Sequence, residues 1–155
     1  MKAFFIKLLL IAIPLGALAQ NNGAGSTLEQ AEDLYQKAEY VAALDMLSNL
    51  LESDIDLSEN IEIQAYLLSG NIYSESGQYA TAANFYNKAL DKSSKYFGKK
   101  DSLTIQAMNN LGQIDFLTGQ IERSFNRNSW VLDRRLELYG ENHPDVADAY
   151  NNLGN

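Results

Sequence analysis

Apolar residues recur every three or four positions along most of the chain. Ile63, Tyr66, Gly70 and Tyr73 follow this spacing, which places them on one face of a helix. Gly77 interrupts the pattern, and a second helical run follows it, with small or apolar residues at Tyr79, Ala82, Ala83, Tyr86, Ala89 and Leu90. The Val, Ile and Thr alternation that is typical of strands does not occur. The sequence therefore predicts pairs of helices and no sheet.

These helix pairs repeat along the chain. Asn109-Asn110-Leu111-Gly112 recurs 42 residues later as Asn151-Asn152-Leu153-Gly154, and a shift of 39 residues aligns an earlier unit. Periods in this range are typical of solenoids, in which each unit packs on its neighbours. We expect units at about 28–58, 59–100, 101–142 and 143–155, the last of them incomplete.

Small residues are expected where two helix axes approach closely, with bulky residues filling the space around them. Gly70 and Ala82 are such small residues, and Tyr73 and Tyr86 are the bulky ones. The complete set of predicted packing residues is Tyr66, Gly70, Tyr73, Ala82, Tyr86, Ala89, Leu111, Gly112, Leu153 and Gly154.

At these positions the chain resembles the tetratricopeptide repeat (TPR) family. The family pattern is an aromatic or apolar residue, Leu-Gly, Tyr, then Ala, an aromatic residue and Ala, and the second unit departs from it only at Ser69. The period and the segment 139–147 are similar to the long repeats of kinesin light chains and of many bacterial proteins. Over residues 28–155 the resemblance implies an all-α, right-handed α-solenoid of antiparallel helix pairs, with about 3.5 repeats.

The third unit departs from the family pattern at two positions. Asp115 and Asn128 stand where aromatic residues are usual. Phe116 lies one residue after Asp115 and Phe125 three residues before Asn128, and we expect the two rings to compensate in the packing.

The first nineteen residues have the pattern of a secretory signal peptide. Two lysines precede an uncharged, mostly apolar run, and Ala17-Leu18-Ala19 is an A-x-A cleavage signal. The alternative, a membrane anchor, is disfavoured because the run is short and contains Pro14 and Gly16. We expect export to the periplasm or beyond, with cleavage after Ala19 and no membrane span in the mature chain.

Two helix starts are predicted from local signals. Residues 20–27 are small and polar, so we expect a flexible linker that ends at Thr27, the N-cap of a helix beginning at Leu28. Pro144 is favourable at the first position of a helix, with Asn142 or His143 as its cap. This setting favours a structural role for His143 over a catalytic one.

Polar residues form a stripe on the first helix of each later unit. Gln106, Asn109, Asn110 and Gln113 share one helical face, as do Asp148, Asn151 and Asn152, and Gln64 and Asn71 are their equivalents in the second unit. The resemblance implies that the first helices line a concave face. Amides pair with peptide backbone through both a donor and an acceptor. We therefore predict a peptide-binding groove, with a solvated face or local helix-to-helix bonding as the alternatives.

Composition excludes several other functions. The chain has no Cys, one His, and 20 acidic against 12 basic residues, a net charge of −8 that becomes −10 without the leader. Thiol chemistry and multi-histidine metal sites are excluded, and nucleic-acid binding is disfavoured. No cofactor and no enzyme site is predicted. The expected function is an exported protein-binding or peptide-binding scaffold.

The alternative is the N-terminal repeat region of a longer exported enzyme or sensor. The repeat pattern runs to residue 155, part-way through a unit. We expect a fragment of a longer protein, and similar bacterial chains often continue into a caspase-like peptidase domain or a signalling domain.

Overall fold

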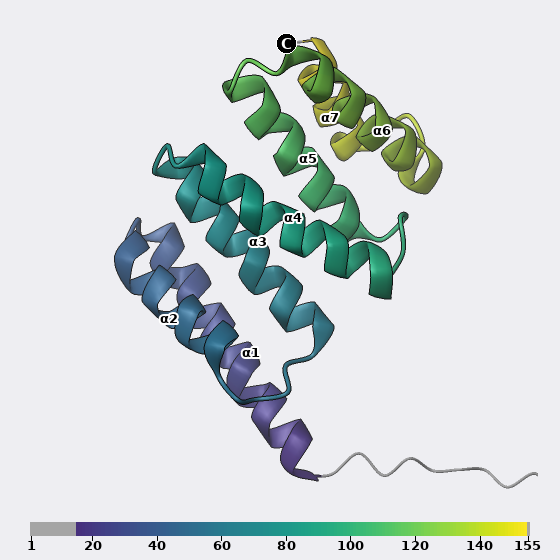
Figure 1. The fold of residues 1–155 in the computed structure, drawn as a ribbon. Helices are drawn as coiled ribbons and strands as arrows, with labels where there is room; N and C mark the ends of the chain where they lie inside the picture. The colour runs from purple at the N-terminus through teal and green to yellow at the C-terminus, as the bar shows by residue number, and fades with distance from the viewer. Residues whose placement is uncertain (1–14, 155) are drawn as a thin grey trace, which may run out of the picture.

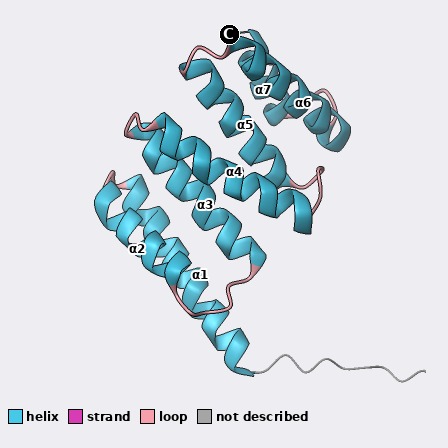
Figure 2. Ribbon diagram, in the orientation of Figure 1, coloured by secondary structure: helices cyan, strands magenta, loops and turns pink. Residues whose placement is uncertain are grey.

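A computed structural model describes residues 15–154 of the chain. In this part the chain forms helices and no strands (Figure 2). The helices are α1 (Leu15–Gln36), α2 (Tyr40–Glu52), α3 (Glu59–Glu75), α4 (Tyr79–Tyr96), α5 (Ser102–Leu117), α6 (Ile121–Tyr139) and α7 (Pro144–Gly154). The all-α fold that the sequence predicts is confirmed.

The helices pair in chain order and the pairs stack into a helical solenoid (Figure 1). Within the pairs, α1 packs on α2, α3 on α4, and α5 on α6, while α7 packs on α6. Helices α1, α3 and α5 also contact one another in sequence. We call the surface of α1, α3, α5 and α7 the first-helix face, and the surface of α2, α4 and α6 the second-helix face.

The turns within the three helix pairs share one backbone conformation. Gly77 and Gly119 have φ values of 72° and 75°, in the left-handed region that glycine adopts without steric cost. Ala38 occupies the equivalent place in the first pair, with a φ of 59°. An alanine in this region is strained by about 1 kcal/mol, because its Cβ crowds the backbone.

Two glycines are required by close helix contacts. A Cβ added at Gly70 would lie 2.5 Å from the Tyr86 ring, and one added at Gly112 would lie 2.3 Å from Oδ1 of Asn128. At both glycines the helices approach too closely for a side chain to fit without displacing its neighbour. Gly154 differs, since a Cβ added there would meet nothing within 4 Å. On the same helix, Tyr150 is exposed and Leu153 is half-buried. The expected packing therefore does not extend to Gly154.

The first helix begins earlier than the sequence predicts. Residues 20–27 lie within α1, so the predicted flexible linker is wrong. Ala24 and Ala31 are both buried in the same apolar cluster, and their spacing of seven residues places them on one helical face. Thr27 does not cap a helix start; its hydroxyl donates to the Gly23 carbonyl at 3.1 Å. Of the predicted signal peptide, residues 1–14 lie outside the described residues.

The third unit has polar and charged side chains at two of its packing positions. Phe116 and Phe125 are 43% and 57% exposed, so the expectation that they compensate is wrong. Asp115, whose side chain is 4% exposed, instead pairs with Nε of Arg127 at 2.7 Å. Asn128 is buried and donates to the Asn152 carbonyl at 2.8 Å. An ion pair and an amide thus replace the aromatic residues of the second unit.

Candidate functional site

The polar residues predicted to form a groove lie on α3, α5 and α7, and they divide into two groups. Those with exposed side chains are Gln64, Gln106, Gln113, Asp148 and Asn151. Those with half-buried or buried side chains are Asn71, Asn109, Asn110 and Asn152. The second group bonds between helices, which is the local-bonding alternative considered for the stripe.

Asn71 is the centre of the first interhelix contact. Its Oδ1 accepts from the Tyr86 hydroxyl at 2.9 Å and from Nδ2 of Asn110 at 3.2 Å. These bonds connect α3 to both α4 and α5. Burial of Tyr86 raises the pKa of its hydroxyl, and the nearby Tyr35 hydroxyl and Glu75 carboxylate raise it further. The phenol therefore stays protonated and remains a hydrogen-bond donor.

A second contact of the same kind joins α5 to α7. Nδ2 of Asn152 donates to Oδ1 of Asn109 at 3.0 Å, and the Asn152 carbonyl accepts from Asn128 on α6. Together, the two contacts form a series of hydrogen bonds between side-chain amides that runs from α3 to α7. We call this series the amide network. It links the first helices, and each of its asparagines already uses at least one polar atom in a hydrogen bond within the protein.

Beside the amide network, the first-helix face has a polar hollow of about 350 Å³. Its lining consists of Ser102, Ile105, Gln106, Asn109, Asn110, Arg135, Tyr139 and Asp145. Arg135 reaches it from the end of α6 and donates to the Asp145 carbonyl at 2.8 Å. The helical spacing of the first helices did not predict Arg135 for this face, because Arg135 belongs to α6. The helix-terminal position of Arg135, beside the start of α7, was the signal that could have found it.

Two further hollows lie along the same face. One of about 330 Å³ between α1 and α3 is lined by Leu28, Glu29, Glu32, Gln64 and Leu68. The other, of about 260 Å³, is lined by Gln113, Phe116, Leu117, Asn128 and Asn152. Phe116 and Leu117 are 43% and 53% exposed there. The face therefore changes from acidic near α1 to amide-rich, with Arg135 and Asp145 side by side, and then to apolar at the end of α5.

His143 is a helix-capping residue. Its Nδ1 accepts from the backbone N–H of Asp145 at 3.2 Å, and its ring stacks on Tyr139 with centroids 4.4 Å apart. Of the two caps expected for α7, Asn142 and His143, the structure shows this bond for His143. Within residues 15–154, no group of three or more His, Asp or Glu side chains is placed to hold a metal ion.

None of the helices between Leu15 and Gly154 is both long and apolar enough to cross a membrane.

Comparison with known proteins identifies the repeats. The family model described as tetratricopeptide repeat matches residues 61–137. Among solved structures, BtubC (BKLC) from P. vanneervenii superposes with a TM-score of 0.70 at 24% sequence identity, over 89% of this chain. The match spans 64% of the BtubC chain, so the present chain is similar to only part of that protein. No curated protein matches the chain.

Proposed function

Residues 61–137 make the chain a tetratricopeptide repeat protein, and from this premise we propose that it is an exported, non-catalytic scaffold that binds a peptide segment on its first-helix face. Repeats of this family serve generally as protein-interaction scaffolds, and stacked helix pairs produce extended concave surfaces. The first-helix face is the concave one in this proposal.

The observation that carries the proposal is the hollow in which Gln106 and Arg135 lie together. The glutamine amide offers a donor and an acceptor to a peptide backbone, and the guanidinium offers donors to a carboxylate or carbonyl. The neighbouring Asn109 and Asn110 are fixed by their interhelix bonds. A rigid wall beside exposed polar groups reduces the entropy that binding must overcome.

A peptide array of random dodecapeptides tests this function. Gln106→Ala and Gln113→Ala remove exposed amides without touching the amide network, and Gln78→Ala removes an exposed amide that lines none of the described hollows. We expect the double variant to weaken bound peptides at least fivefold, and the control variant to leave them unchanged. Peptides that bind all three proteins equally well would contradict binding at this face.

Export is the second part of the proposal. The A-x-A signal at 17–19 lies within α1, and cleavage after Ala19 would leave the helix from Gln20 onward, including the buried Ala24. The packing of Ala24 and Ala31 therefore survives removal of the leader. Intact mass of the protein recovered from the periplasm or medium is expected to match a chain that begins at Gln20. A product that keeps residues 1–19 would refute cleavage.

A second candidate function is the repeat region of a longer exported enzyme or sensor, with a caspase-like peptidase or signalling domain following the repeats. The coding sequence after Asn155 tests this candidate directly, since a stop codon there would eliminate it.

A further inference from the structure

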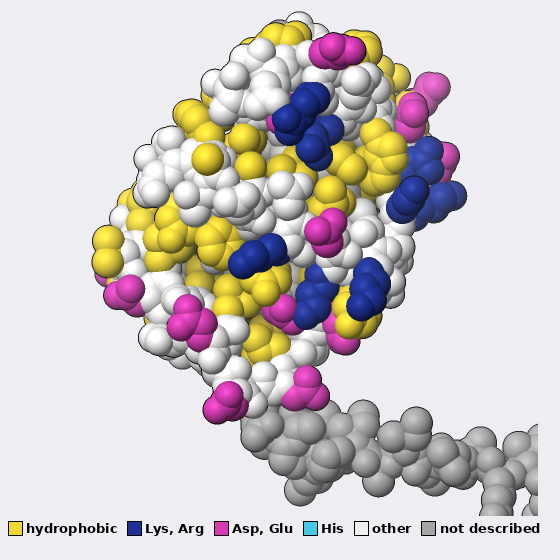
Figure 3. All heavy atoms as spheres, viewed as in Figure 1, with side chains coloured by type: hydrophobic (Ala, Val, Ile, Leu, Met, Phe, Trp, Pro, Cys, Tyr) yellow, Lys and Arg dark blue, Asp and Glu magenta, His cyan; other side chains and the backbone are white. Residues whose placement is uncertain are grey.

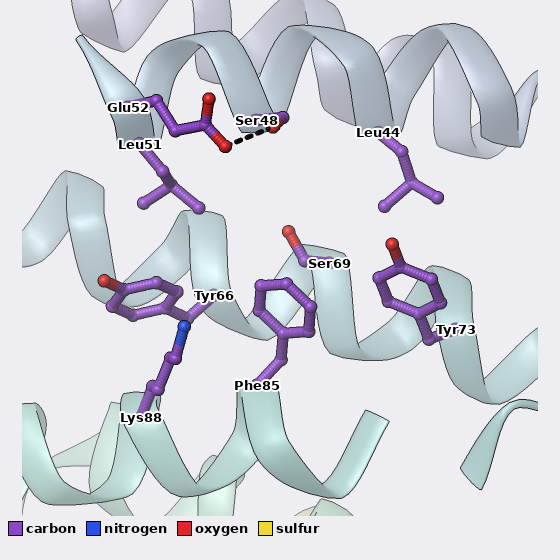
Figure 4. A pocket seen from close by; sticks show the side chains of 9 residues that line it. All are labelled: Leu44, Ser48, Leu51, Glu52, Tyr66, Ser69, Tyr73, Phe85 and Lys88. Atoms are coloured by element: carbon purple, nitrogen blue, oxygen red, sulfur yellow. Dashed lines mark hydrogen bonds between the residues drawn. The ribbon is translucent and has the colours of Figure 1, made fainter. Parts of the chain in front are cut away.

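The second-helix face contains a groove of its own, between α2 and α4 with α3 as its floor (Figure 4). We call it the α2–α4 groove. It is lined by Leu44, Ser48, Leu51 and Glu52 from α2, Tyr66, Ser69 and Tyr73 from α3, and Phe85 and Lys88 from α4. Its volume is about 220 Å³, below the roughly 300–1,000 Å³ of small-molecule sites, so it suits a single side chain better than a cofactor.

Three half-buried rings form one side of the groove. Tyr73 and Phe85 stack with centroids 5.4 Å apart and planes 14° apart, and Tyr66 lies 6.3 Å from Phe85. Leu44 and Leu51 approach from the opposite side (Figure 4). Figure 3 shows hydrophobic side chains gathered along the boundary between α2 and α4. The groove therefore offers an apolar lining that is only partly covered by the protein itself.

Lys88 supplies a positive charge at this apolar lining. Its Nζ lies 5.5 Å from the Tyr66 ring centroid and 5.3 Å from that of Phe85. Among the described residues, no carboxylate lies within ion-pair distance of Lys88. Glu52, on the opposite rim, accepts instead from the Ser48 hydroxyl at 3.0 Å. Lys88 is exposed, so the cation held over these rings is open to an incoming anion.

The positive character continues along α4. A second hollow of about 450 Å³ shares Tyr66 and Lys88 with the groove and is lined further by Glu62, Asp91, Lys92, Lys95 and Tyr96. Lys92 pairs with Glu62, and Lys95 lies 5.1 Å from the Tyr96 ring centroid. Three lysines and two carboxylates thus line this hollow, and only Lys92 among these lysines has a carboxylate partner in the described part of the chain.

The aromatic lining is not a requirement of the solenoid. In the next repeat, Asp115 and Arg127 occupy the places of Tyr73 and Phe85, and they fill that position with an ion pair at 2.7 Å. The same helix packing is therefore reached without exposed rings. Tyr66 and Tyr73 also pack against the core, so the buried parts of these rings serve the fold, and their uncovered parts are open to a partner.

We propose that the α2–α4 groove binds an acidic segment of a partner protein, with an aliphatic or aromatic side chain of the segment seated against the rings and a neighbouring carboxylate on Lys88. This surface lies on the second-helix face, so it is independent of the proposed first-helix function. The apolar contact supplies most of the affinity, and the lysines select for negative charge and make binding sensitive to salt.

Panning a phage-displayed random dodecapeptide library on the full chain tests this inference. Enriched peptides are then synthesised, and their dissociation constants are measured by fluorescence anisotropy. Ser48→Arg places a long side chain over the groove, and Asn49→Arg makes the same change of charge at an exposed neighbour on α2 that lines none of the described hollows. Lys88→Glu reverses the cation, and Lys99→Glu is its control in the loop after α4.

We expect a class of enriched peptides that carry Asp or Glu beside an apolar residue. Ser48→Arg and Lys88→Glu should each weaken them at least tenfold, while both controls stay within twofold of the wild type. If acidic peptides bound by charge attraction alone, Ser48→Arg would strengthen their binding, because the substitution adds a positive charge. Acidic peptides that bind all variants equally, or the absence of such a class, would overturn the inference. Peptides weakened only by the Gln106 and Gln113 variants would support the first-helix site alone.

Discussion

Replacing the ion pair of the third repeat with the aromatic pair of the second tests the account of solenoid packing most directly. The exchange is Asp115→Tyr with Arg127→Phe, since Tyr73 and Phe85 hold these places one repeat earlier. Arg127 also places Nη1 3.4 Å from the Met108 sulfur, where Tyr66 stands in the second repeat. A phenylalanine there would meet a thioether, which is a favourable ring contact.

The single substitution Asp115→Tyr should be costly. It removes the carboxylate that pairs with Arg127 at 2.7 Å and with Arg123 at 2.8 Å. Breaking a fully buried pair costs about 3–5 kcal/mol, but the side chain of Arg127 is 22% exposed and can recover part of its hydration. We therefore expect a loss of about 2 kcal/mol in the free energy of unfolding, or roughly 8 °C in Tm.

The double variant should recover most of this loss, because well-packed apolar residues often replace a buried ion pair without cost. Urea unfolding followed by circular dichroism on the wild type, both single variants and the double variant gives the coupling energy. We expect at least about 1.5 kcal/mol of favourable coupling, and additivity within about 0.5 kcal/mol would refute the interpretation that the two pairs are equivalent packing solutions.

Three further predictions concern single sites. Gly70→Ala should lower the free energy of unfolding by about 1–3 kcal/mol, because its Cβ would lie 2.5 Å from the Tyr86 ring, whereas Gly154→Ala should change little; thermal unfolding of the two variants compares them. Ala38→Gly should raise Tm, since it relieves a φ of 59°, and an unchanged or lower Tm would contradict the strain. The raised pKa of Tyr86 should make the free energy of unfolding fall above about pH 10, because the unfolded chain loses the tyrosine proton first. In urea titrations, Tyr86 should contribute up to about 1.4 kcal/mol per pH unit to this decrease, and Tyr86→Phe should remove that contribution.

The fold was predictable because its determinants are local and periodic. The spacing of Ile63, Tyr66, Gly70 and Tyr73 specifies a helical face, and the repetition of that face specifies a stack. The start of α1 was not predictable from composition, because residues 20–27 contain few apolar side chains. Ala24 is buried there in an apolar cluster that includes residues of α2 and α3. Packing between helices of this kind cannot be recognised from the composition of a short segment.

The candidate site was predictable only in part, for a related reason. Helical spacing placed Gln106, Asn109 and Asn110 on one face correctly, but it could not show which amides face a neighbouring helix. That depends on the separation between first helices, which the packed side chains determine. Arg135 was missed because it enters the site from another helix, near a turn.

The amide network limits how this protein can achieve specificity. Asn110 and Asn152 hold equivalent places in successive repeats, and the hydrogen-bonding capacity of the network is partly used in holding α3, α5 and α7 together. A partner that relied on them alone would compete with the fold's own bonds. Selectivity must therefore come from residues that break the repeat: Arg135 on one face, and Lys88 with its rings on the other. On this reasoning, substitutions at the non-repeating positions should change which partner is bound, whereas substitutions in the network should change stability first.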